Sequence, residues 1–107
     1  MRTTIDSGGK SVTAILFILN AAPYGSEHTY NGLRLAGALA KREENTVRVF
    51  LMGDAAAAAH RNQKVPQGYY NVEVMIGNVV RHGGVVGVCG SCMDARGIAG
   101  DSLADGC

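Results

Sequence analysis

The feature that most constrains the fold is an uninterrupted apolar run, VTAILFIL, at residues 12–19. The run is rich in β-branched residues, and it lacks the polar alternation of a strand that keeps one face in water. Such a run is typical of a strand in a parallel sheet, which is covered on both faces. It is also much shorter than the roughly 20 residues that a membrane-spanning helix needs. The run therefore predicts a buried strand.

Strand and helix patterns alternate along the rest of the chain. Ser26 is placed to cap the first helix, and glycines follow the last one. The predicted helices cover 27–41, 54–61 and 72–80, and the further strands cover 46–52 and 85–89. Because short strand–helix–strand connections force parallel pairing, we predict an α/β fold. Its expected form is a three-layer α/β/α sandwich with a parallel sheet of about four to five strands.

Length and composition favour a single domain. The chain has 107 residues, of which 47% are apolar, and this suffices for one hydrophobic core. We expect the domain to cover 12–107, after a flexible, polar N-terminal arm at 1–11. Ten Lys and Arg residues against nine Asp and Glu residues give no electrostatic reason to expect nucleic acid or a membrane as a partner.

The cellular compartment is inferred from two features of the sequence. The N-terminal segment lacks the pattern of a signal peptide. The chain has three cysteines, and an odd number in a chain able to build an ordinary core fits reduced thiols better than a disulfide framework. We therefore expect a cytoplasmic protein.

Two of the cysteines, Cys89 and Cys92, stand three residues apart where the third predicted strand gives way to a turn. A thiol at the start of a short helix meets unpaired N–H groups and a positive dipole, which stabilise the thiolate. Arg96 adds positive charge nearby. Because the thiolate is the form that attacks sulfane sulfur or a disulfide, we interpret Cys89 as the favoured reactive thiol and Cys92 as its partner.

Two other interpretations of the pair stay open. Free cysteine is among the most buried residue types, and Cys89 continues a run of valines, so a packing role is the first alternative. A zinc site is the second, but structural zinc needs four ligands, and His60, His82 and Cys107 are scattered singly. We therefore expect no metal and no cofactor.

Loops that follow the carboxyl ends of parallel strands gather at one edge of the sheet, where ligands bind. The loops expected to converge there are 20–28, 62–70 and 89–97. They would bring Ser26, Lys64 and Arg96 to Cys89 as substrate-binding residues, with the cations holding its thiolate. The alternatives are a helix cap for Ser26 and a solvated loop charge for Lys64.

Four segments occur in a recognisable order between about residues 15 and 98. They are ILNAAPYGSEHTYNGLRLAGAL, VRVFLMGDA, RNQK and VCGSCMDARGI. Together they resemble the DsrE/DsrF-like family, and specifically its YchN-like branch. The resemblance implies a parallel sheet between helices, sulfur chemistry, and assembly as a homo-oligomer, commonly a hexamer.

The resemblance also implies roles for the two cysteines. In the sulfur-relay members of the family, the acceptor cysteine lies at a strand end before an Arg-Gly turn, and Cys89 stands at that place, eight residues before Gly97. Cys92 belongs to the pattern of the YchN-like branch. In members of the family, a helix and a final strand follow the region that residues 101–106 resemble. We therefore expect this domain to lack these two elements.

The functional hypothesis is a small cytoplasmic, sulfurtransferase-like sulfur carrier. Cys89 would accept sulfane sulfur as a persulfide, and Cys92 would resolve it as a disulfide. The expected partners are further copies of the chain and sulfur donor and acceptor proteins. The alternative is a non-enzymatic oligomeric binding or regulatory module whose pocket holds a small anion or a nucleotide-like ligand. A reactive, exposed Cys89 separates the two.

Overall fold

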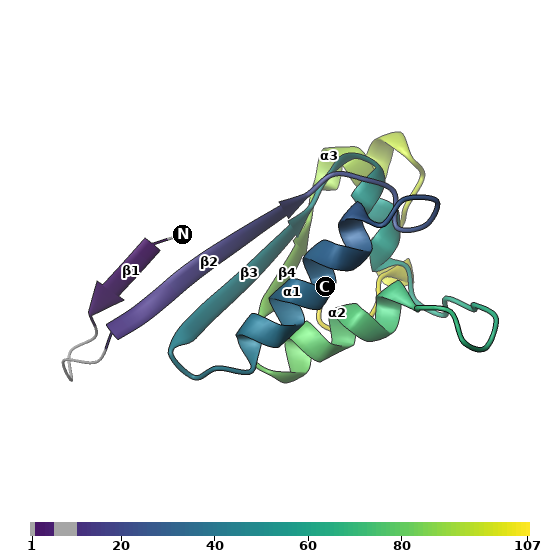
Figure 1. The fold of residues 1–107 in the computed structure, drawn as a ribbon. Helices are drawn as coiled ribbons and strands as arrows, with labels where there is room; N and C mark the ends of the chain where they lie inside the picture. The colour runs from purple at the N-terminus through teal and green to yellow at the C-terminus, as the bar shows by residue number, and fades with distance from the viewer. Residues whose placement is uncertain (1, 6–10) are drawn as a thin grey trace.

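A four-stranded sheet carries two helices on one of its faces (Figure 1). The computed structural model describes residues 2–5 and 11–107. The strands lie side by side in the order β1 (Arg2–Ile5), β2 (Ser11–Leu19), β3 (Asn45–Leu51) and β4 (Val85–Val88). β2, β3 and β4 are parallel, and β1 pairs with β2 in the antiparallel direction. The predicted α/β fold with a parallel sheet is confirmed.

The parallel part of the sheet has three strands among the described residues, fewer than the four to five predicted. The fourth strand, β1, lies within the segment 1–11 for which we expected a flexible arm, and residues 2–5 of that segment pair with β2. An edge strand is held by backbone hydrogen bonds, which a polar segment makes as well as an apolar one. Residues 1 and 6–10 of the expected arm lie outside the described residues.

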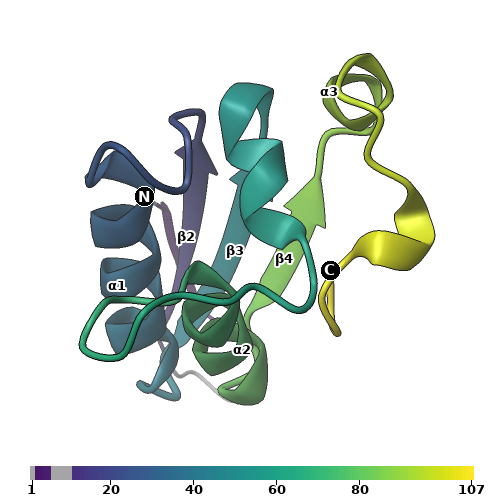
Figure 2. The ribbon, with the colours of Figure 1, turned by 90° about the vertical axis from the view of Figure 1, so that its right-hand side faces the viewer.

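The two main helices are α1 (His28–Ala40) and α2 (Val72–Arg81), and both cover the same face of the sheet (Figure 2). The N-cap residue of α1 is Glu27 rather than the predicted Ser26, because the helix begins one residue later than expected. Ser26 Oγ accepts the His28 N–H at 3.3 Å from the position before the N-cap. At the start of α2, Asn71 Oδ1 accepts the Val74 N–H at 3.3 Å. Within the described part of the chain, no helix is long and apolar enough to cross a membrane.

The remaining helices are short. The alanine-rich segment predicted as an α-helix forms the 3-10 helix η1 (Gly53–Ala59), and most of its alanines are fully buried. α3 (Gly90–Ala95) and the 3-10 turn η2 (Gly100–Ser102) follow β4. The chain then returns to η1, where Ala104 N–H donates to Ala59 O at 2.7 Å. Small buried side chains let η1 approach the sheet closely, so packing rather than helix propensity decides its form.

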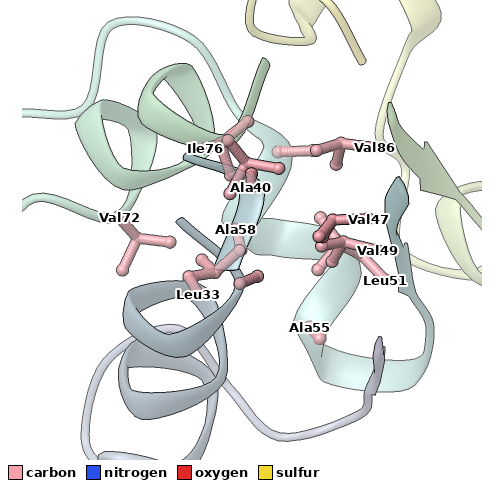
Figure 3. Packing of buried hydrophobic residues seen from close by; sticks show 13 residues of the cluster. Leu33, Ala40, Val47, Val49, Leu51, Ala55, Ala58, Val72, Ile76 and Val86 are labelled. Carbon is pink, nitrogen blue, oxygen red and sulfur yellow. The ribbon is translucent and has the colours of Figure 1, made fainter. Parts of the chain in front are cut away.

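The hydrophobic core lies between the sheet and its helical layer (Figure 3). The inward sides of β3 and β4 contribute fully buried branched residues, and the helices supply the facing ones. The large core residues are Leu33, Val47, Val49, Leu51, Val72, Ile76, Val79 and Val86. Each such side chain stabilises the fold by about 1.5–3 kcal/mol relative to an exposed position. The core therefore fixes the strands whose ends carry the candidate site.

The other face of the sheet has no helical layer in the described part of the chain, so one protomer has two layers rather than the three predicted (Figure 2). Its residues remain accessible to solvent, with Leu16 and Ile18 each 58% exposed and Val85 59% exposed. The number of layers differs because an apolar run shows that both sides of a strand are apolar, but it does not show what covers each side.

The Asn71 cap offers a test of the fold. Its side chain also donates to Gln63 O at 3.0 Å, so Asn71→Ala loses both a cap and a loop contact. We expect Asn71→Ala to lower the free energy of unfolding by about 1–2 kcal/mol in urea titrations. Asn71→Asp keeps the cap acceptor and should lose about half as much. Equal stability of Asn71→Ala and the wild type would contradict this role.

Candidate functional site

The carboxyl ends of the three parallel strands meet at one edge of the sheet, and backbone hydrogen bonds join them there. Met52 N–H donates to Leu19 O at 3.0 Å, and Cys89 N–H donates to Leu51 O at 2.9 Å. Gly53 then turns the chain with φ +57°, a conformation that side-chain-bearing residues rarely adopt. The edge is therefore a rigid platform for the loops that follow each strand.

Cys89 lies at the end of this edge, as the N-cap residue of α3, and is partly exposed. Its Sγ lies 3.3 Å from Ser91 Oγ. The side chain of Cys92, the side chain of Ser91 and the nearby backbone N–H groups lower the pKa of Cys89 to about 7. A thiol with this pKa is about half thiolate at neutral pH. Cys89 therefore supplies a nucleophile without a separate general base.

Cys92 lies in the first turn of α3, where it links Cys89 to the loop after β3. Gly53 N–H donates to Cys92 Sγ at 3.2 Å. Because this sulfur accepts the Gly53 N–H, its own S–H is available to Cys89, in agreement with the lowered pKa of that thiol. The backbone at the end of β3 thus positions the Cys92 thiol, which follows β4.

The Arg96 side chain contacts the main-chain carbonyl of Cys92 rather than either thiol. Arg96 Nη1 donates to Cys92 O at 3.1 Å. Its Nε and Nη2 donate to Asp54 Oδ1 at 3.3 and 2.9 Å, which ties the end of α3 to the start of η1. The groups that lower the pKa of Cys89 are Cys92 and Ser91 rather than Arg96 or Lys64. The substrate-binding role predicted for Arg96 stays a prediction.

The three expected loops converge only in part. Loops 20–28 and 62–70 meet, because the Tyr24 hydroxyl donates to Gln63 Oε1 at 2.5 Å and the Tyr24 and Tyr70 rings stack. Loop 20–28 also lies beside Arg96, across a cleft. Among the described residues, no hydrogen bond or ion pair joins loop 62–70 to loop 89–97.

Lys64 belongs to the loop that stays apart from the thiols. In Figures 1 and 2, segment 62–70 extends past α1 and α2 on the side away from α3. The Lys64 side chain is exposed there. Ser26 accepts the His28 N–H in the turn that leads into α1, whose N-cap residue is Glu27. Within one protomer, these two residues are therefore placed apart from the polar groups that contact Cys89.

The third cysteine differs from the first two. Cys107 packs against the hydrophobic core. Burial and then the charge of Glu73 raise its pKa, which disfavours the thiolate. In the part of the chain that the structure describes, no three His, Cys, Asp or Glu side chains gather as a metal site would require. The activated thiol is thus Cys89.

Sequence reasoning missed three residues that shape the site, namely Ser91, Gly53 and Asp54. Ser91 carried a local signal, because a hydroxyl two residues after a helix N-cap is close to that cap side chain. Gly53 and Asp54 follow a different strand, and their contacts with α3 depend on how β3 and β4 pair. Only the folded sheet brings them to Cys92 and Arg96.

Ser91 provides a test of the pKa assignment. The alkylation rate of Cys89 should rise with pH through a midpoint near 7, because only the thiolate reacts. Ser91→Ala removes a group that stabilises the thiolate, so the midpoint should move up and the rate at pH 7 should fall roughly two- to fivefold. Ser102→Ala, whose hydroxyl donates to Ala99 O at 2.7 Å, is the control and should leave the profile unchanged. An unshifted midpoint in Ser91→Ala would refute the assignment.

Comparisons with known proteins identify the family and agree with the fold. The sequence model of the DsrE/DsrF-like family matches residues 13–107, a span that includes both edge cysteines. Protein YchN of Escherichia coli K12 is 44% identical over 93 residues, which are 86% of this chain and 79% of YchN. An uncharacterized protein of Methanocaldococcus jannaschii is 36% identical over 89 residues, 83% of this chain and 76% of that protein. The crystal structure of E. coli YchN matches with a TM-score of 0.80 at 41% identity, over 89% of this chain and 80% of that one.

Proposed function

Because the chain belongs to the DsrE/DsrF-like family, which is linked to sulfur relay, we propose that it is a small sulfur carrier loaded on Cys89. The observation that carries the proposal is a partly exposed thiol whose pKa is held at about 7 by Cys92 and Ser91. A carrier that relies on free thiols needs a reducing compartment, so the proposal includes a cytoplasmic location.

The loading step is nucleophilic substitution at sulfur. The Cys89 thiolate attacks the outer, sulfane sulfur of a donor persulfide R–S–SH, and a new Cys89–S bond forms as the donor S–S bond breaks. The donor leaves as the thiolate RS⁻ and takes a proton from water, while Cys89 carries –S–SH. One sulfur atom moves between two thiols, so the step requires no external oxidant or reductant.

Two routes release the sulfur. An acceptor nucleophile attacks the outer sulfur, and Cys89 leaves as its thiolate. Alternatively, the Cys92 thiol attacks the Sγ of Cys89, which forms a Cys89–Cys92 disulfide and expels the outer sulfur as hydrosulfide. The second route needs a cellular dithiol to reduce the disulfide before the next cycle. Cys92 is suited to it because its S–H is available to Cys89.

Competitive alkylation tests which thiol is the acceptor. With limiting iodoacetamide near pH 7, we expect Cys89 to be labelled before Cys92 and Cys107, because its lowered pKa makes the thiolate abundant. Peptide mass spectrometry after proteolysis identifies the labelled residue. Faster labelling of Cys92 would transfer the acceptor role to it, and labelling of neither would favour a binding module without a reactive thiol.

A further inference from the structure

A cleft of about 380 Å³ lies between loop 20–28, the start of η1 and the end of α3. Its walls combine apolar side chains with charged or titratable ones. The apolar walls are Ala22, Pro23, Ala57 and Ile98, and the polar ones are Asp54, His60 and Arg96. A concave site with apolar walls and a few convergent polar groups is the usual form of a small-molecule site. The cleft is therefore a candidate site that the sulfur chemistry of Cys89 does not explain.

The ion pair in the cleft leaves hydrogen-bonding capacity unused. A guanidinium has five N–H donors. Arg96 spends one on Cys92 O and two on Asp54 Oδ1, so two remain. Asp54 Oδ2 receives no hydrogen bond from the described residues, and the side chain of Asp54 is 70% exposed. Two residues that line the cleft thus keep free donors and a free carboxylate oxygen.

Charge selects the class of ligand. Asp54 repels a simple anion that approaches Arg96, and Arg96 repels a simple cation that approaches Asp54. A molecule with both charges avoids each repulsion, since its carboxylate takes the free N–H groups of Arg96 and its ammonium takes Asp54 Oδ2. The apolar walls then accommodate a short side chain. His60 also lines the cleft, and an imidazole N–H can serve as a further donor for the carboxylate.

We propose that this cleft binds a free α-amino acid, and that the sulfur-bearing form, cysteine persulfide, is a donor to Cys89. The identity of the donor rests on the proposed function, whereas amino-acid binding does not. Arg96 connects the two sites, because it lines the cleft and its guanidinium donates to the carbonyl of Cys92. Asp54 and Arg96 are ligand-binding residues in this proposal.

Binding is tested first, with an unreactive probe. S-methyl-L-cysteine carries both charges but no thiol, and titrating it should shift the NMR amide signals of Gly53, Ala57 and Gly97. Analogues that lack the ammonium or the carboxylate should bind about ten- to hundredfold more weakly. Asp54→Asn should cause the same loss, and Asp54→Glu should restore part of the binding.

The control for these variants is the exposed pair Arg42–Glu44, 3.7 Å apart and remote from the cleft, at the turn before β3. Glu44→Gln should leave binding unchanged. Thermal unfolding of each variant separates loss of binding from loss of fold. The absence of shifts at millimolar probe, or equal binding by the wild type and a folded Asp54→Asn, would overturn the amino-acid site.

Loading is tested second, with two donors. Asp54→Asn should slow the loading of Cys89 from cysteine persulfide more than loading from inorganic polysulfide, which has no ammonium or carboxylate to recognise. An equal fall for both donors would overturn the donor assignment. If no donor loads the wild-type protein, the proposed function fails, and the binding titration still decides the amino-acid site.

Discussion

Replacing Cys89 with serine is expected to abolish the gain of one sulfur atom that the wild-type protein should show after incubation with a persulfide donor. A serine hydroxyl is not ionised near neutral pH and does not attack sulfane sulfur. Cys107 does not substitute for Cys89, because burial raises its pKa. Intact-protein mass spectrometry before and after treatment with a reducing thiol measures the adduct and its reversibility.

Two companion variants make this result specific. Cys107→Ser should load as the wild type does, since that thiol packs against the core. Cys92→Ser should still load but should accumulate the adduct, because a serine hydroxyl cannot resolve the persulfide into a disulfide. An adduct that survives in Cys89→Ser and disappears in Cys92→Ser would exchange the roles of the two thiols.

The sequence predicts those parts of the site that follow from local pattern and strand order. The end of β4 and the short helix after it place Cys89 at an N-cap position, and both elements could be read from the apolar run and the glycines around it. The direction of its pKa shift follows from that position as well. The family assignment is confirmed, because the DsrE/DsrF-like family model matches residues 13–107 and YchN is 44% identical over 93 residues.

What the sequence does not predict depends on contacts between distant segments. The donation from Gly53 to Cys92 and the pairing of Asp54 with Arg96 arise because η1 packs beside α3. Lys64 follows η1 in the chain, yet its loop packs toward Tyr24. Strand order alone does not determine which way a long loop turns after it leaves the sheet edge.

The fold shows the same division between local and distant information. β2 and β3 are predicted because their apolar runs suit burial, whereas β1 is held by backbone pairing that leaves no hydrophobic pattern. The alanines of η1 have a strong helix propensity, and burial against the sheet still gives a 3-10 helix. An apolar strand predicts that both faces of the sheet are covered, but it does not determine what covers the second face.

The open face of the sheet leads to a second prediction, which concerns assembly of the chain into an oligomer. Leu16 and Ile18 project from β2, Phe50 from β3 and Val85 from β4, and the register sets Ile18 beside Phe50. The register also sets the exposed Arg48 between Leu16 and Val85, so this face is mostly apolar with one charge in it. Monomeric proteins rarely leave extended apolar surfaces open. We expect a second copy of the chain to cover this face, in agreement with the homo-oligomer predicted from the family.

Ile18→Lys is therefore expected to convert the expected homo-oligomer into smaller species, because it places a charge on the contact surface, where removal from water is costly. Light scattering coupled to size-exclusion chromatography measures the mass at micromolar concentration. The matched control is Val74→Lys, which replaces a residue that is 57% exposed on α2, on the other side of the molecule. Val74→Lys should keep the wild-type mass. A wild-type monomer would contradict assembly through any surface, and an oligomer that survives Ile18→Lys would exclude the sheet face as the contact.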